Sequence, residues 1–217
     1  MSQEITNIIT EIKIIIIGKS GSGKTSYVNR WIKNTFNETY KSTIVSEFSH
    51  KTYIFKNKTY KINLWDLAGQ DHFNSLIKAF CKEAKGCITM ADILLPSSLN
   101  DALNWKKTLD ENETLADGSN IPNILILNKY DLINSEKKDF NVIEEFVKKN
   151  KFDAWFKTSA KTGENIKESM DTLLEIVINK LKDINDCDSS RFKNSLALEP
   201  RKCSGMDILR NKQSGCC

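Results

Sequence analysis

Residues 18–25 read GKSGSGKT and match the pattern G-x-x-x-x-G-K-[ST], which is suited to binding a phosphate chain. The stretch lies between an apolar run and a helical pattern, as this mechanism requires. Its glycines let backbone N–H groups close around phosphate at a helix N-terminus, where the helix dipole favours anions. A plain glycine-rich turn is the alternative. The residues expected to line the phosphate site are Ser20, Gly21, Ser22, Gly23, Lys24, Thr25 and Ser26.

Two short patterns together predict a metal bound to a triphosphate. The Lys24 ammonium would reach the β and γ phosphates, and the Thr25 hydroxyl would bind Mg²⁺. Downstream, Asp66 and Gly69 form a D-x-x-G pattern. Asp66 can hold a water on Mg²⁺, and the backbone N–H of Gly69 can approach the γ-phosphate. The pattern alone also suits a simple strand end, so its position after the phosphate loop is what gives it weight.

Two later segments indicate which base is bound. They are NKYD at residues 128–131 and TSAK at residues 158–161. The Asp131 carboxylate can accept both the N1–H and the N2 amino hydrogens of guanine, whereas adenine offers no such pair of donors. A site built on buried hydrogen bonds rejects an analogue that lacks the partner by roughly 10⁴-fold or more. The predicted ligand is therefore GTP or GDP.

Other residues of the same two segments complete the predicted base site. The Lys129 stem would cover the face of the base, Asn128 would tie this loop to the phosphate loop, and the Ala160 N–H would meet the guanine O6. The segment NKYD by itself equally suits an Asn/Asp-rich turn. The order of the four patterns favours the guanine site. Also expected in it are Ser159 and Lys161.

Strand-like and helical patterns alternate along the chain and would bring these loops together. Strand-like segments cover residues 12–17, 48–55, 60–66, 87–93, 123–129 and 155–160. Helical patterns cover residues 24–33, 99–109, 141–149 and 166–181. Such alternation predicts an α/β fold with a mostly parallel sheet and helices on both faces. Ligands bind beyond the C-terminal ends of such strands, where all four patterns fall.

Composition is consistent with one cytosolic domain. The chain has 217 residues, of which 40% are hydrophobic and 28% charged. The net charge of +4 is scattered along the chain, so we expect no nucleic-acid partner. No apolar run approaches the roughly 18 residues of a membrane span, and no signal peptide is recognisable. In a reducing compartment, Cys81 and Cys87 are expected to be unpaired in or near the core.

Taken together, these patterns resemble the Ras-like small GTPases over residues 11–181, and more narrowly the Rab proteins. The resemblance implies a P-loop NTPase small G-domain with a six-stranded, mostly parallel sheet, one antiparallel strand and five helices. It implies a monomer that switches between GTP and GDP states and hydrolyses GTP slowly without an activating protein. The segments KEAKG and AWFKTSAK are most similar to the Rab subgroup of lysosome-related organelles and mitochondria-associated membranes.

The resemblance also assigns roles to single residues. Phe36 would stack on the guanine, Tyr40 would close over the phosphates, and Gln70 would orient the attacking water. Thr43 would bind Mg²⁺ and the γ-phosphate in the GTP state. The implied catalytic set is Gln70, Lys24 and Thr43, and the implied metal set is Thr25, Thr43 and Asp66.

A row of aromatic residues, Phe48, Trp65 and Phe80, corresponds to the triad that Rabs use at effector surfaces. Ordinary core packing is an equal alternative for these rings. The segments TIV at residues 43–45 and GQDH at residues 69–72 depart from the common Rab patterns. The identity of effectors therefore does not follow from the resemblance.

The last part of the chain, residues 182–217, loses its apolar periodicity and is expected to be a flexible tail. It ends in Cys216 and Cys217, a double-cysteine ending like that of Rabs. Because one lipid anchors only marginally and two anchor stably, we expect geranylgeranyl groups on both thiols. A pair of unmodified surface thiols is the alternative. The anchor would hold the protein reversibly on the cytosolic face of organelle or vesicle membranes.

The resemblance implies several protein partners: an exchange factor, a GTPase-activating protein, a GDP-dissociation inhibitor, an escort protein for lipid attachment, and effectors. A second function from a different class stays open. It is a GTP-binding scaffold that scarcely hydrolyses GTP and is controlled by exchange or abundance. Gln70 and Thr43 favour the hydrolysing switch.

Overall fold

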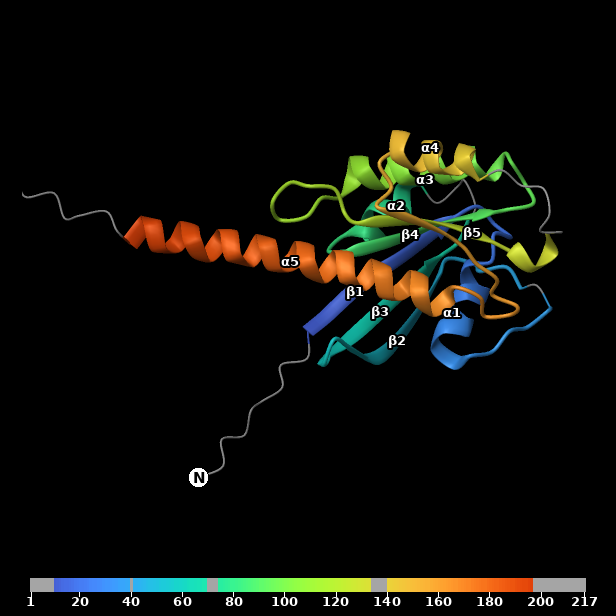
Figure 1. Cartoon of the computed structure of the whole chain (residues 1–217), viewed down its shortest axis with the longest axis horizontal. Coiled ribbons are helices and arrows are strands. Elements are labelled where there is room, and N and C mark those ends of the chain that lie inside the picture. The colour runs from blue at the N-terminus through green and yellow to red at the C-terminus, as the bar shows by residue number, and fades with distance from the viewer. Residues whose placement is uncertain (1–9, 40, 70–73, 134–139, 197–217) are drawn as a thin grey trace, which may run out of the picture.

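A buried apolar strand, β1 (Thr10–Gly18), runs through the middle of the structure (Figure 1). The computed structural model describes residues 10–39, 41–69, 74–133 and 140–196. Strand β1 pairs in parallel with β3 (Lys58–Leu67) on one side and β4 (Gly86–Asp92) on the other. Because both faces of β1 are covered by helices, its sequence is an almost continuous run of isoleucine rather than an alternation.

The described strands form one six-stranded sheet in the order β2-β3-β1-β4-β5-β6. Its other strands are β2 (Ser46–Phe55), β5 (Asn123–Asn128) and β6 (Ala154–Lys157). Strand β2 is antiparallel to β3, and every other pairing is parallel. The predicted α/β fold with a mostly parallel sheet and one antiparallel strand is confirmed.

Helices cover both faces of this sheet (Figure 1). The helices of the described residues are α1 (Lys24–Lys33), α2 (Asn74–Cys81), α3 (Ser98–Asn112), α4 (Asn141–Lys149) and α5 (Ile166–Leu196). Ile14 of β1 packs in a core with Tyr27 of α1 and Leu173 of α5. Its neighbour Ile15 faces the other way and packs with Trp105 of α3. The five helices that the Ras-like resemblance implied are confirmed.

Two helices differ from those predicted from the sequence. Helix α2 has only eight residues and was not predicted as a separate element. Helix α5 was expected to end near Leu181, but it continues to Leu196. Residues 182–196 contain no glycine or proline, so a helix already nucleated on the core can propagate through them. The division of the chain into a domain and a tail at residue 182 stays a prediction.

The structure also places the ends of the predicted strands. The β2–β3 connection is a two-residue turn in which Lys56 and Asn57 both adopt positive φ, as a tight hairpin requires. The strand predicted over residues 155–160 ends at Lys157. Beyond it the chain forms a loop, because the Ser159 N–H donates to the Glu164 carbonyl rather than to a neighbouring strand.

Cys81 and Cys87 are buried and unpaired, as expected. Within the described part of the chain, none of the helices combines the length and the apolar character needed to cross a bilayer.

Candidate nucleotide-binding site

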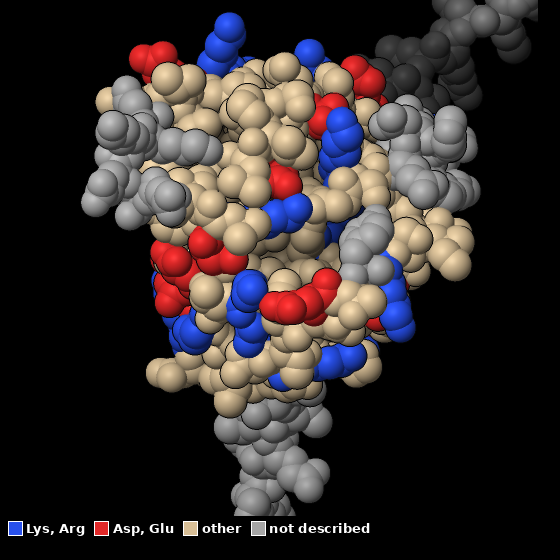
Figure 2. Space-filling model, turned by 90° about the vertical axis from the view of Figure 1, so that its right-hand side faces the viewer, with Lys and Arg blue, Asp and Glu red and all other residues tan. Residues whose placement is uncertain are grey.

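A cavity of about 720 Å³ opens at the end of the molecule where the parallel strands terminate. Figure 2 views this end and shows basic and acidic side chains intermingled around a central hollow. The predicted site residues that line the cavity are Ser20, Gly21, Gly23, Lys24, Thr25, Ser26, Phe36, Thr43, Gly69, Asn128, Lys129, Asp131, Ala160 and Lys161. Residues far apart in the sequence therefore meet at one site, as the topology predicts.

Three further predicted site residues that the structure describes do not line the cavity. Ser22, Asp66 and Ser159 are buried directly behind its lining, where they contact lining residues. Tyr40 and Gln70 lie outside the described residues.

Lys24, in the first turn of α1, places a buried ammonium at the phosphate end. Its Nζ donates to the carbonyls of Gly18 and Lys19, at 2.7 and 3.1 Å. Burial lowers the pKa of Lys24 to about 8, although the nearby Asp66 carboxylate opposes that shift. An anion bound at the helix N-terminus would stabilise the charged form.

Three side-chain oxygens from different elements converge beside this lysine. The hydroxyls of Thr25 and Thr43 are 3.0 Å apart, and the Thr25 hydroxyl also donates to Asp66 Oδ2. The other carboxylate oxygen, Asp66 Oδ1, is buried and has no hydrogen-bond partner among the described residues. Burial raises the pKa of Asp66 to about 6. The set fits Mg²⁺, which prefers oxygen ligands and usually shares them with substrate phosphates.

Two glycines allow the loops of the phosphate end to approach one another. A Cβ on Gly69 would lie 2.2 Å from the backbone nitrogen of Ser20, and the Ser20 N–H donates to the Gly69 carbonyl at 3.0 Å. Gly23 has φ of +95°, and a Cβ there would lie 2.1 Å from Asn128 Nδ2. Any larger residue would separate the phosphate loop from its neighbours.

Asn128, at the end of β5, joins three loops at the base end. Its Nδ2 donates to the Ser22 carbonyl at 2.9 Å. Its Oδ1 accepts from the Thr158 hydroxyl at 3.2 Å and from the Ala160 N–H at 3.1 Å. The first contact is the tie to the phosphate loop that the sequence predicted. The Ala160 N–H, expected to meet the guanine O6, is shared with Asn128 in this structure.

Asp131 and Ser159 face one another across the same end. The Ser159 hydroxyl donates to Asp131 Oδ1 at 2.6 Å and accepts from the Thr162 N–H at 3.0 Å. This pairing orients the carboxylate, because one of its oxygens is held by a fixed hydroxyl. The second oxygen is then available to a donor in the cavity.

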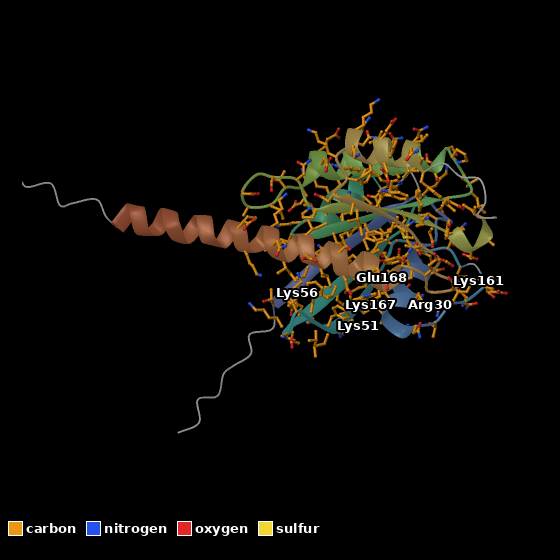
Figure 3. The ribbon with its side chains drawn as sticks, viewed as in Figure 1. Arg30, Lys51, Lys56, Lys161, Lys167 and Glu168 are labelled. Atoms are coloured by element: carbon orange, nitrogen blue, oxygen red, sulfur yellow. The ribbon has the colours of Figure 1, made fainter. Side chains whose placement is uncertain are left out.

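Sequence reasoning missed residues that hold the TSAK loop. Arg30 of α1 donates from Nε to the Ala160 carbonyl at 2.8 Å and from Nη2 to the Lys161 carbonyl at 2.5 Å. Figure 3 shows Arg30 and Lys161 close together at this end of the molecule. The Lys161 ammonium also lies 3.0 Å from Glu38. Nothing in a local pattern marks these contacts, since Arg30 precedes the loop by 130 residues.

The predicted aromatic row forms a continuous run of tilted ring contacts away from the cavity. Trp65 lies between Phe48, with ring centroids 5.1 Å apart, and Phe80, at 5.7 Å. Phe48 is 49% exposed, whereas Trp65 and Phe80 pack partly against the core below α3. The row thus runs from the surface into the core. The exposed outer ring suits an effector surface, and the inner rings suit ordinary core packing.

The chain is similar to one protein family and to several of its members. Residues 13–179 match the model of the Ras family. Human Ras-related protein Rab-32 is 35% identical over 167 residues, which cover 76% of this chain and 74% of that protein. Rat Ras-related protein Rab-7L1 is 31% identical over 194 residues, covering 89% and 94%. Ras-related protein Rab-32A of Dictyostelium discoideum is 36% identical over 169 residues, covering 76% and 77%.

The family match covers the sheet from residue 13 of β1 onward and includes all four loops of the cavity. Proteins of this family bind guanine nucleotides, hydrolyse GTP and, as Rabs, act in membrane trafficking with regulators and effectors. By its fold, its cavity and these relatives, the chain belongs to the Ras family and is a Rab-type small GTPase.

Proposed function

We propose that the cavity binds GTP and GDP together with Mg²⁺, with the phosphates at Lys24 and the guanine at Asp131. The observation that carries this assignment is the meeting of the Thr25–Thr43–Asp66 oxygens and the Asn128 network in one cavity. Bound Mg²⁺ would supply positive charge to the β and γ phosphates. Thr25, Thr43 and Asp66 would hold it, directly or through water.

The contact between Thr43 and Thr25 supports a role for Thr43 as a sensor of the γ-phosphate. Thr43 lies in the segment before β2, and the Ala68 N–H binds the Val45 carbonyl at 3.0 Å, which joins this segment to β3. Loss of the γ-phosphate would remove one of the groups that hold Thr43 at the metal. The segment would then be free to rearrange, which is how nucleotide state would control effector binding.

Displacement of a fluorescent guanine nucleotide tests the base assignment. GTP and GDP should displace it at far lower concentrations than ATP. Asp131→Asn should shift preference toward xanthosine nucleotides by at least about tenfold, because the amide presents a donor where guanine also has one. Equal competition by ATP and GTP in the wild type would contradict the assignment.

Single-turnover hydrolysis separates the switch from the scaffold that scarcely hydrolyses GTP. Slow intrinsic hydrolysis that an activating protein accelerates is expected, and in the related Ras protein that acceleration is about 10⁵-fold. Gln70→Leu should reduce stimulated hydrolysis while leaving GTP affinity intact. Unchanged stimulation would remove Gln70 from the mechanism, and hydrolysis that no activating protein accelerates would favour the scaffold.

We also propose that the protein is held on organelle membranes by lipids on Cys216 and Cys217, which lie outside the described residues. Escort protein, exchange factor and GDP-dissociation inhibitor would serve this cycle as they serve Rabs. The similarity to Rab-32 and Rab-7L1 supports a role at lysosome-related organelles. The Phe48–Trp65–Phe80 row, with its exposed outer ring, is the proposed effector surface.

A further inference from the structure

An ion pair adjoins the base end of the cavity and joins Lys129 of the NKYD segment to Asp92, a residue outside the four sequence patterns. Asp92, the last residue of β4, accepts from the Lys129 ammonium at 2.6 Å. The Asp92 side chain is 9% exposed and that of Lys129 is 33% exposed. Lys129 lines the cavity, whereas Asp92 stands behind it.

The position of Asp92 is fixed by the turn that leads into α3. The Ser98 hydroxyl donates to the Asp92 carbonyl at 2.8 Å and accepts from the Asp92 N–H at 3.1 Å. The second carboxylate oxygen, Oδ1, accepts from the Leu94 N–H at 2.9 Å. One oxygen therefore secures the carboxylate to its own loop, which leaves Oδ2 for the lysine.

Lys129 is held at the backbone as well. It adopts a positive φ of 69°, an uncommon conformation for a residue with a side chain. On either side of it, the Ile93 N–H binds the Asn128 carbonyl at 3.1 Å and the Tyr130 N–H binds the Thr158 carbonyl at 3.0 Å. Because the backbone and the ammonium are both held, the aliphatic stem between them is confined to the cavity wall.

We propose that Asp92 is a positioning residue that holds the stem of Lys129 across the nucleotide base and thereby slows nucleotide release. The inference rests on the proposed guanine site. A free lysine side chain would have to be ordered each time the base binds, which costs conformational entropy. The ion pair with Asp92 orders the Lys129 side chain before the base binds.

Release of a ribose-labelled fluorescent GDP, chased with excess GDP at saturating Mg²⁺, tests the proposal. Asp92→Asn keeps the shape and the acceptor for Leu94 but removes the charge that holds Lys129. Release should be about fivefold to tenfold faster, within the range that contacting pairs show in double-mutant cycles. Wild-type release from this variant would overturn the proposal.

A matched control removes the carboxylate partner of a second lysine, one that lies away from the cavity. Lys106 of α3 is 5% exposed and pairs with Asp110 at 2.5 Å, and neither residue lines the cavity. Asp110→Asn should lower the melting temperature but release GDP at the wild-type rate. If it accelerated release as much as Asp92→Asn does, the Asp92 effect would be one of general stability and the proposal would fall.

A second variant shows whether Asp92 acts through Lys129. Lys129→Met keeps an apolar stem against the base but lacks the ammonium. Asp92→Asn should give no further acceleration in this background, whereas an equal acceleration in both backgrounds would refute the coupling. A wild-type protein that failed to bind labelled GDP would instead remove the proposed nucleotide site itself, so the two failures are distinct.

Discussion

At the scale of single residues, the phosphate end of the cavity contains two buried charges that are only partly compensated. Lys24 is 6% exposed and Asp66 is 1% exposed. Their pKa values shift in opposite directions, to about 8 and about 6, since burial penalises the charged form of each. These uncompensated charges destabilise the protein without its ligand. Phosphate would compensate the charge of Lys24 and Mg²⁺ that of Asp66, so the site favours ligand binding over the stability of the empty protein.

The raised pKa of Asp66 predicts how the stability of the ligand-free protein depends on pH. The folded state binds this proton more tightly than the unfolded chain does, so its stability should fall as pH rises from about 4 to about 6. A shift from 3.8 to about 6 corresponds to at most about 3 kcal/mol above pH 6. Asp66→Asn should therefore stabilise the nucleotide-free protein at pH 7.5 while abolishing tight Mg²⁺-nucleotide binding.

Denaturant unfolding of the nucleotide-free protein across this pH range measures that effect. The gain from Asp66→Asn should grow between about pH 4 and pH 6 and then level off. Glu175→Gln, which removes a half-exposed carboxylate of α5, is the matched control. A gain from Asp66→Asn that is independent of pH would contradict the role of the buried charge.

At the scale of elements, the loops of the site are held mainly by helices and by each other. Helix α1 begins with Lys24 of the phosphate loop. The same helix carries Arg30, which donates to carbonyls of the TSAK loop. Asn128 connects that loop and the phosphate loop to the end of β5. The phosphate loop, the TSAK loop and the end of β5 are therefore one connected unit. Displacement of any of them should shift the others.

Helix α5 consists of two parts that differ in their apolar pattern. In the first part, Met170, Leu173 and Val177 are fully buried, and Ile184 packs against a core cluster. We expect amide hydrogen exchange to be slow over residues 166–181 and at least about tenfold faster over residues 186–196, whose sequence lacks the apolar periodicity of the first part. Hydrogen exchange with mass spectrometry resolves the two parts. Equal protection along α5 would show that the C-terminal part has a further packing partner.

At the scale of the whole molecule, the cavity and the exit of the C-terminal segment lie at opposite ends. Figure 1 shows α5 projecting beyond the sheet on the side away from α1 and the ends of the parallel strands. With 31 residues, this helix is roughly 46 Å long at 1.5 Å per residue. The described part of the chain therefore ends, at Leu196, on the side of the molecule opposite the cavity.

Removal of both terminal thiols tests the proposed lipid anchor. Wild-type protein from eukaryotic cells should carry two prenyl groups by intact mass and fractionate with membranes, because two lipid chains are needed for stable anchoring. Cys216→Ser combined with Cys217→Ser should be released to the soluble fraction. Cys187→Ser combined with Cys203→Ser is the matched control and should stay with membranes. Unmodified wild-type protein on membranes would refute the lipid anchor.

The sequence alone determined the type of fold and most residues that line the cavity. The residues that do the chemistry lie in short contiguous patterns, such as residues 18–25. The isoleucine run of β1 has one stable environment, the middle of a parallel sheet covered by helices on both faces. In such a sheet the loops after the strands must meet at one edge, so the order of the patterns already implied a shared site.

Only the tertiary structure decided what holds that site together. The pairing of Asp92 with Lys129 spans 37 residues and that of Arg30 with Ala160 spans 130, and neither leaves a local periodicity. The length of α5 and the half-exposed position of Phe48 were equally undetermined. Local patterns report which face of an element is apolar, but which side chains meet across a loop or a sheet edge depends on packing between distant segments, and the sequence does not encode that packing locally.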